Sequence, residues 1–168
     1  MDAELRVHKG AVTFFVDGYA VGFTSFKSSE HRDDDLVLET IERTVKDMSD
    51  RGVRLFFVPV YFDWPGDGVY DFSVVDRRVR AVFEAAGEGA YVIIRVQAKV
   101  MAPQWWMDAN PEGVCKCGYD SDEGMARVRY STHKCPSLGS DFWETAGLGA
   151  LEAMARHVKG QDYGERVV

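Results

Sequence analysis

The feature that most constrains the fold is an alternation of short apolar runs with longer segments of helical periodicity. Residues 53–60 (VRLFFVPV) and 90–97 (AYVIIRVQ) are apolar almost throughout, as strands of a parallel sheet covered on both faces are. Residues 19–26 (YAVGFTSF) are expected to form an earlier buried strand, and residues 165–168 (ERVV) the start of a later one. The order of strands and helices predicts successive right-handed βα units and an α/β fold.

Three segments carry apolar residues on one face of a helix, at 35–52, 72–89 and 140–159. Gly52 is expected to end the first helix, and Ser140 to cap the amino end of the third. The predicted apolar stripes consist of Val37, Ile41, Val45 and Met48; of Val75, Val79, Val82, Phe83 and Ala86; and of Trp143, Ala146, Ala150, Leu151, Met154 and Val158.

A short antiparallel β-ribbon is predicted at residues 5–18, before the first βα unit. Lys9-Gly10 and Asp17-Gly18 are the expected turns. Two-residue hairpin turns favour such pairs because both positions need positive φ.

The segments that follow the strands differ from those that follow the helices. The segments after 53–60 and 90–97 are long and aromatic, and the second of them is expected to be a loop over 97–140. This asymmetry is typical of a (β/α)8 TIM barrel, whose site is built from loops at the carboxyl ends of its strands. The chain is therefore predicted to be a single domain, residues 1–168, forming the N-terminal half of such a barrel after the ribbon. A doubly wound sheet is less favoured because 27–35 (KSSEHRDDD) is acidic and lacks glycine.

Composition excludes several classes of function. The formal net charge of −7 argues against nucleic acid as a partner, since phosphate binding needs clustered Lys and Arg. No apolar run reaches the roughly 18 residues of a membrane span. The amino end is charged from its second residue, which is unlike a signal peptide and predicts a cytoplasmic protein. Three cysteines, an odd number, do not form a disulfide framework.

Several motifs together resemble one protein family. The chain resembles the N-terminal part of β-galactosidase-like glycoside hydrolases of the family 42 type, from about residue 5 to residue 168. Its most specific part is a strand ending in Arg95, followed by APQWW and NPE. The residues that carry the resemblance are 13–21 (TFFVDGYAV), 56–62 (FFVPVYF), 70–87 (YDFSVVDRRVRAVFEAAG), 90–112 (AYVIIRVQAKVMAPQWWMDANPE) and 136–143 (PSLGSDFW).

The resemblance implies a retaining glycosidase that hydrolyses β-galactosides or related β-glycosides. Such enzymes use two carboxylates about 5–5.5 Å apart. In the family these follow strand four and end strand seven, so both are expected beyond residue 168. The chain is then expected to supply substrate-binding segments of a carbohydrate-hydrolysing enzyme, without turnover by itself. Its expected partners are a carbohydrate and either the other barrel half or a second copy, since a half barrel exposes strand edges and an apolar face.

Two other interpretations stay open. The chain is alternatively a non-catalytic carbohydrate-binding or interaction module, or a regulatory fragment held together by zinc. Sugar binding by the isolated chain would favour the first of these, and its metal content tests the second.

The candidate sugar-binding residues lie after the second and third strands. Trp105 and Trp106 are expected to offer aromatic faces to sugar C–H groups, with one ring facing the pocket and the other buried. Arg95 is expected at the barrel mouth, where its planar fork can bind hydroxyls or a carboxylate. The alternatives are indoles that only pack the loop, and a structural ion pair for Arg95.

Tyr61 and Trp64 follow the second strand and are further candidates for contact with a sugar. They could instead belong to a tight turn that shields the barrel end. Asp63 and Asp71 are not expected to be catalytic, since the family chemistry uses later strands. Arg127, in ARVRY, is a candidate through the resemblance, and a solvated loop charge is its alternative.

A possible metal site lies in the same long segment. Cys115, Cys117, His133 and Cys135 would form a tetrahedral Cys3His set, which suits a structural Zn²⁺ ion. Reduced free thiols are the alternative. No cofactor is expected to be required for the chemistry.

Overall fold

The computed structural model describes the chain in five stretches that form two compact units. The described residues are 2–21, 25–27, 34–96, 102–115 and 135–168. The first unit takes its residues from Met1–Phe62, Asp71–Gln97 and Ala155–Val168, and the second from Asp63–Tyr70 and Ala98–Met154.

The first unit begins with a three-stranded antiparallel sheet, β1 (Ala3–His8), β2 (Ala11–Val16) and β3 (Tyr19–Val21), in that order. Both predicted turns are present, and all four of their residues have positive φ, as primed hairpin turns require. The predicted ribbon is thus confirmed. The prediction of one strand over 19–26 is wrong, because its first part completes this sheet and its last part belongs to another.

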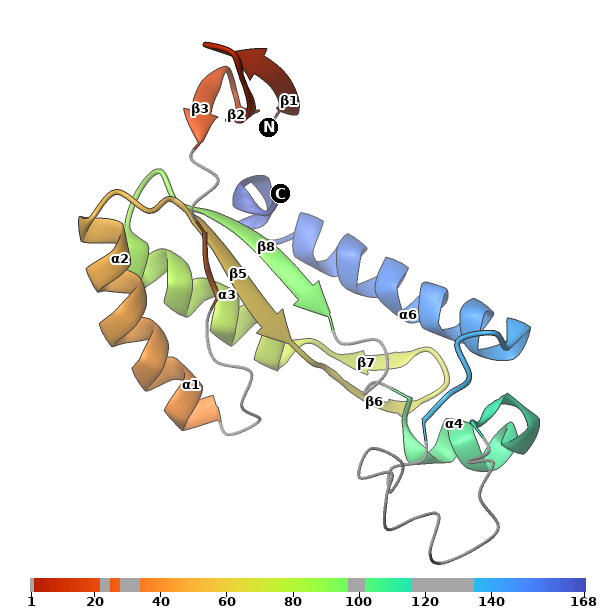
Figure 1. The fold of residues 1–168 in the computed structure, drawn as a ribbon. Coiled ribbons are helices and arrows are strands. Elements are labelled where there is room, and N and C mark those ends of the chain that lie inside the picture. The colour runs from red at the N-terminus through yellow and green to blue at the C-terminus, as the bar shows by residue number, and fades with distance from the viewer. Residues whose placement is uncertain (1, 22–24, 28–33, 97–101, 116–134) are drawn as a thin grey trace, which may run out of the picture. The chain divides into compact units, whose positions relative to one another are not determined.

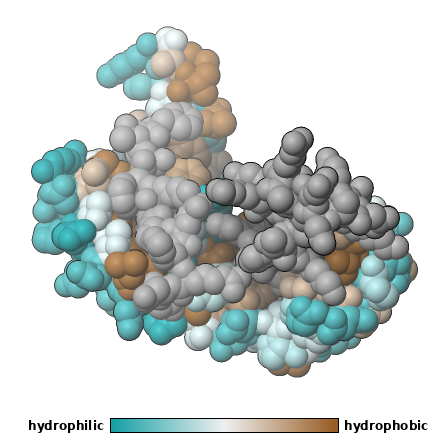
Figure 2. Space-filling view, turned by 60° about the horizontal axis from the view of Figure 1, so that its bottom comes forward, coloured by the Kyte–Doolittle hydropathy of each residue, from teal (hydrophilic) through white to brown (hydrophobic). Residues whose placement is uncertain are grey.

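One face of this N-terminal sheet is apolar along its whole length. Its register places Leu5 opposite Phe14 and Val7 opposite Val12. Figure 2 shows hydrophobic atoms gathered on this sheet at the top of the view. Leu5, Val7 and Val12 are 62–72% exposed, so much of this face is open to solvent.

A parallel sheet follows, with strands β4 (Ser25–Lys27), β5 (Leu55–Val60) and β8 (Tyr91–Val96) side by side in chain order (Figure 1). Val167 adds an isolated parallel bridge to Val92 on the far side of β8. The predicted start of a later strand is therefore reduced to this single bridge, which comes after a short 3-10 helix, Gly164–Arg166. The described residues form a mixed α/β fold.

Helices cover this sheet much as the sequence predicts. The first helical stretch is continuous through α1 (Asp34–Thr40), the π-helical η1 (Ile41–Val45) and α2 (Lys46–Asp50), and Gly52 follows with φ of 90°. Helix α3 (Ser73–Ala86) packs against β5 and β8, and the first stretch packs against α3 (Figure 1). The stripe residues Val37, Ile41, Val45, Val75, Val79 and Val82 are fully buried.

A small apolar cluster joins the N-terminal sheet to the amino ends of the parallel strands. Val16 and Val21 are buried there with Leu55, the first residue of β5. Tyr91, the first residue of β8, and Val168 pack against the same cluster. The first unit therefore has its N-terminal sheet at one defined end of its parallel strands.

The second unit contains a hairpin and two helical segments. The hairpin consists of β6 (Asp63–Gly66) and β7 (Val69–Asp71), the last residue of which belongs to the first unit. The two segments are α4 (Gln104–Ala109) and the 3-10 helix η3 (Pro111–Gly113). The prediction of a continuous loop over 97–140 is wrong where these helical segments form.

Local chemistry explains α4. Pro103 precedes it with φ of −72°, close to the value that a helix needs. The Gln104 amide donates to Asp108 one turn later, at 2.7 Å. Both candidate tryptophans therefore lie on a helix.

Helix α6 (Asp141–Lys159) begins in the second unit and ends in the first. Its predicted stripe is largely buried, with Trp143, Ala150, Met154 and Val158 each under 9% exposed. Ser140 does occupy the predicted cap position, because its carbonyl accepts from the Glu144 N–H at 2.9 Å, but its buried Oγ makes no capping hydrogen bond to a described residue. Among the helices of the described residues, none is long and apolar enough to cross a membrane.

Candidate aromatic binding site

All four tryptophans of the chain gather in the second unit. Trp64 comes from β6, Trp105 and Trp106 from α4, and Trp143 from the first turn of α6. The ring centroids of Trp64 and Trp105 are 5.5 Å apart, and those of Trp106 and Trp143 are 5.0 Å apart, both in edge-to-face geometry. These separations are typical of favourable aromatic pairs, so the cluster stabilises this unit.

The two neighbouring tryptophans of α4 have different surroundings. Trp106 is 4% exposed and packs so closely on Gly113 that a Cβ there would lie 3.0 Å from its ring. Trp105 is half-buried, and its Nε1 donates to the Trp64 carbonyl at 2.7 Å. The Trp105 ring is thereby held in place while part of it stays accessible.

A cavity of about 640 Å³ opens beside these rings. Its volume falls within the roughly 300–1,000 Å³ of typical small-molecule sites. Five aromatic and four polar side chains line it, together with two small residues. The lining residues are Trp64, Tyr70, Trp105, Trp106 and Phe142; Asp67, Asn110, Asp141 and Thr145; and Ala146 and Gly149.

One of the lining residues carries a buried hydrogen-bond donor without an acceptor among the described residues. Trp64 is 5% exposed, and its Nε1 has no hydrogen-bond partner among the described residues. A buried N–H without an acceptor costs about 1–3 kcal/mol. This unmet donor belongs to a residue that lines the cavity.

Of the other candidate sugar-binding residues, Arg95 and Tyr61 do not line this cavity. Arg95 is an exposed residue of β8 in the first unit, opposite Pro59 of β5. Tyr61 follows β5, and the Arg78 guanidinium lies 4.9 Å from the centre of its ring. Arg127 lies outside the described residues. Contact of any of these residues with a sugar stays a prediction.

Arg78 is a residue that the sequence did not single out. It is 1% exposed, and its Nη1 donates to the Pro59 carbonyl at 2.8 Å. Its position in α3 carries no local signal of burial, because an Arg among the apolar residues of a helix normally faces solvent.

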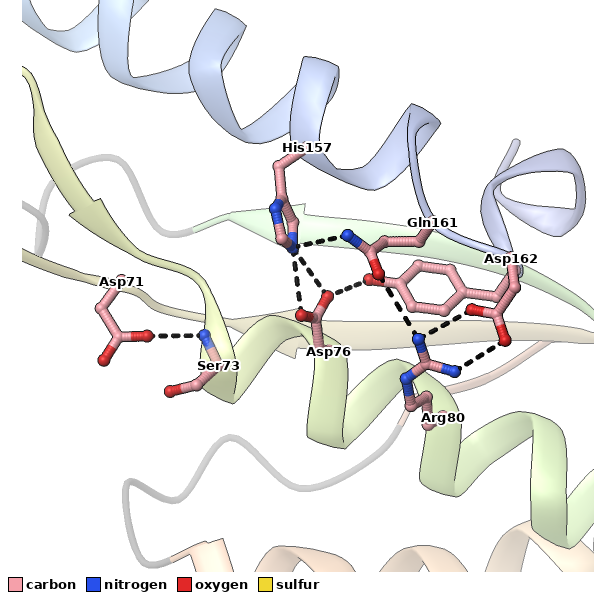
Figure 3. A network of polar contacts seen from close by, with 8 residues as sticks. Asp71, Ser73, Asp76, Arg80, His157, Gln161 and Asp162 are labelled. Atoms are coloured by element: carbon pink, nitrogen blue, oxygen red, sulfur yellow. Dashed lines mark hydrogen bonds and ion pairs between the residues drawn. The ribbon is translucent and has the colours of Figure 1, made fainter.

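A network of polar side chains, which the sequence analysis also did not predict, links α3 to the end of α6 and to the residues after it (Figure 3). The Asp76 carboxylate accepts a hydrogen bond from the Tyr163 hydroxyl, and its Oδ1 lies 2.9 Å from His157 Nε2. Burial, and then the Asp76 hydrogen bond, raise the pKa of Tyr163 above its ordinary value. Beside them, Arg80 pairs with Asp162 at 2.7 Å. The arrangement ties two helices together within the first unit.

The cysteines that the structure describes lie at a two-stranded contact in the second unit. Val114 and Pro136 form an isolated antiparallel bridge, and the Cys115 amide donates to the Cys135 carbonyl at 2.8 Å. The two cysteines do not form a disulfide with each other, and the Cys115 thiol donates to the Pro136 carbonyl at 3.5 Å. Cys117 and His133 lie outside the described residues, and within the described ranges no group of three or more His, Cys, Asp or Glu is placed to hold a metal.

No protein-family model matches the chain, and no curated protein matches its sequence.

Proposed function

We propose that the chain supplies the carbohydrate-binding part of a glycoside hydrolase that acts on β-galactosides or related β-glycosides. The observation that carries the proposal is the cavity of the second unit, where aromatic rings lie next to carboxylate, amide and hydroxyl groups.

This mixture of groups suits a sugar ring. A pyranose has apolar C–H faces and a rim of hydroxyls, so it needs flat apolar surface and hydrogen-bonding groups side by side. Trp105 offers a partly exposed ring in a fixed position. Asn110 and Thr145 can exchange hydrogen bonds with hydroxyls, while Asp67 and Asp141 can accept them.

The strand order supports a barrel as the setting. The parallel strands lie in chain order, and Val167 bridges to β8, the third of them. In a doubly wound sheet with the strand order 3-2-1-4, the fourth strand lies beside the first strand and not beside the third. We therefore favour the N-terminal half of a (β/α)8 barrel. The cavity residues Trp64 and Trp105 come from segments that follow the carboxyl ends of β5 and β8, where barrel enzymes build their sites.

The proposed chemistry is retaining hydrolysis by two carboxylates. In the family that the chain resembles, these carboxylates follow strand four and end strand seven, so the proposal assigns the described residues to substrate binding and not to proton transfer. Asp67 and Asp141 are binding groups in this proposal.

A structural zinc ion is also proposed. Cys115 and Cys135 are opposite each other beside the Val114–Pro136 bridge, and opposite positions in an antiparallel pair place Cβ atoms about 4.5–5.5 Å apart on one face. Two thiolates at that separation can share one Zn²⁺ ion with bonds of about 2.3 Å. Cys117 and His133 would complete the set, and the ion would hold the segment together without taking part in hydrolysis.

Calorimetric titration with lactose and cellobiose tests the proposal. We expect saturable binding, and we expect Trp105→Ala to weaken it at least tenfold, because the variant loses the accessible ring. Tyr19→Ala is the matched control, since Tyr19 is an exposed aromatic residue of the first unit.

Absence of binding by the unmodified chain, or unchanged binding by Trp105→Ala, would contradict the proposal. Hydrolysis of aryl β-glycosides by the protein in which the chain occurs separates an enzyme from a purely binding module.

A further inference from the structure

We infer that the cavity selects sugars by charge: it accepts neutral sugars, prefers sugars that carry a free ammonium group, and disfavours uronic acids and other anionic sugars. This inference rests on the proposed carbohydrate-binding function and names the substrate class of the same site.

The first argument is the charge of the lining residues. Two of them, Asp67 and Asp141, are acidic, and none of the described lining residues is Lys, Arg or His. Both carboxylates would repel an anion in the cavity, while an ammonium group would be attracted to both.

The second argument is the exposure of these two carboxylates and their lack of a bonding partner among the residues that the structure describes. Asp67 lies in the turn between β6 and β7, next to Gly68 with φ of 67°, and Asp141 is the first residue of α6. Both are exposed, and neither makes a hydrogen bond or ion pair with another described residue. Asp108, on α4 in the same unit, instead accepts a hydrogen bond from Gln104. Within the described part of the chain, no side chain neutralises either cavity carboxylate.

The third argument is the aromatic surface beside them. The faces of Trp and Tyr rings attract ammonium groups, most strongly where water is displaced. Trp64, Trp105 and Trp106 all line the cavity, with Tyr70 5.4 Å from Trp64 between ring centroids. The aromatic rings and the carboxylates of the cavity therefore both attract an ammonium group.

The amino end of α6 would by itself attract anions, because its backbone N–H groups are partly positive. Its first turn carries Asp141 and Glu144, which offset that effect.

The test compares three disaccharides of similar size by calorimetric titration at about pH 6, where carboxylates are ionised and alkylammonium groups are charged. They are the disaccharide of glucosamine, its N-acetylated form and a disaccharide of glucuronic acid. We expect the free amine to bind at least about fivefold more tightly than the acetylated form, with the glucuronic acid disaccharide the weakest. Added salt should reduce the difference.

The double variant Asp67→Asn, Asp141→Asn removes both charges and keeps hydrogen-bonding side chains, so it should lose the preference and bind the free amine and the acetylated form equally. Asp63→Asn is the matched control, because Asp63 is exposed on the same hairpin but does not line the cavity. Equal binding of all three sugars, or a preference that persists in the double variant, would overturn the inference.

The outcomes also separate this inference from the proposed function. Binding of the neutral sugar that depends on Trp105 but shows no charge preference leaves the proposed function standing and overturns the inference. Absence of binding by every sugar overturns both.

Discussion

Nε2 of His157, in the last turns of α6, lies 2.9 Å from the Asp76 carboxylate in the first turn of α3, although 81 residues separate them in sequence. The Tyr163 hydroxyl donates to the same carboxylate oxygen. One carboxylate therefore holds the end of α6 and the residues after it against α3.

The first prediction concerns the ionisation of Tyr163. Its pKa is raised by burial and by the Asp76 carboxylate, so the folded value exceeds the unfolded value of about 10. The neutral phenol thus contributes stability that is fully present below about pH 10 and is lost as pH rises through the folded pKa. In a phenolate absorbance titration, Tyr163 should ionise in a late step, above the ordinary tyrosine pKa of about 10, and Tyr163→Phe should remove this step. Ionisation of every tyrosine in one step near pH 10, with the fold intact, would contradict this.

The second prediction concerns Asp76 itself. Asp76→Ala leaves two partners without their acceptor, the Tyr163 hydroxyl and His157, and should lower the free energy of unfolding by about 1–3 kcal/mol. Asp162→Asn is the control, because its ion pair with Arg80 is largely exposed and should matter little. Urea denaturation measures both. Equal effects of the two substitutions would refute the role given to Asp76.

The third prediction separates the two neighbouring tryptophans. Trp106→Ala should destabilise the protein by about 3–5 kcal/mol, because the ring is 4% exposed and packs on Trp143. Trp105→Ala should cost less stability, since its ring is only half-buried. Thermal unfolding followed by circular dichroism compares them. A larger loss of stability for Trp105→Ala than for Trp106→Ala would contradict the assignment of Trp106 as the more important packing residue.

The fourth prediction concerns zinc. Protein prepared with zinc present should retain about one Zn²⁺ ion per chain after dialysis, and Cys115→Ser or Cys135→Ser should each abolish retention, because a structural site needs its full set of four ligands. Elemental analysis measures the content. Less than about 0.2 zinc per chain in the unmodified protein would rule out the site.

The main helices and strands could be predicted because each leaves a periodic pattern in its own segment. The stripe of Val37, Ile41 and Val45 is one example, and all three are fully buried. The division of residues 19–26 between two sheets could not be predicted, because it depends on strand partners elsewhere in the chain.

The same limit applies to the candidate site. The sequence drew attention to Trp64, Trp105 and Trp106, which do meet around one cavity. It gave no sign that Asp67 and Asp141 line the same cavity, because 74 positions separate them and no local pattern links the β6–β7 turn to the start of α6.

Nuclear magnetic resonance of the indole N–H groups tests the central claim, that the cavity of the second unit holds a sugar, most directly. The four tryptophans give four indole signals, which Trp→Phe variants assign. On titration with lactose or the glucosamine disaccharide, the signals of Trp64 and Trp105 should shift in a saturable way. The signal of Trp143, which does not line the cavity, should shift less. If no indole signal shifts at any sugar concentration, or if only that of Trp143 does, the cavity is not a sugar site.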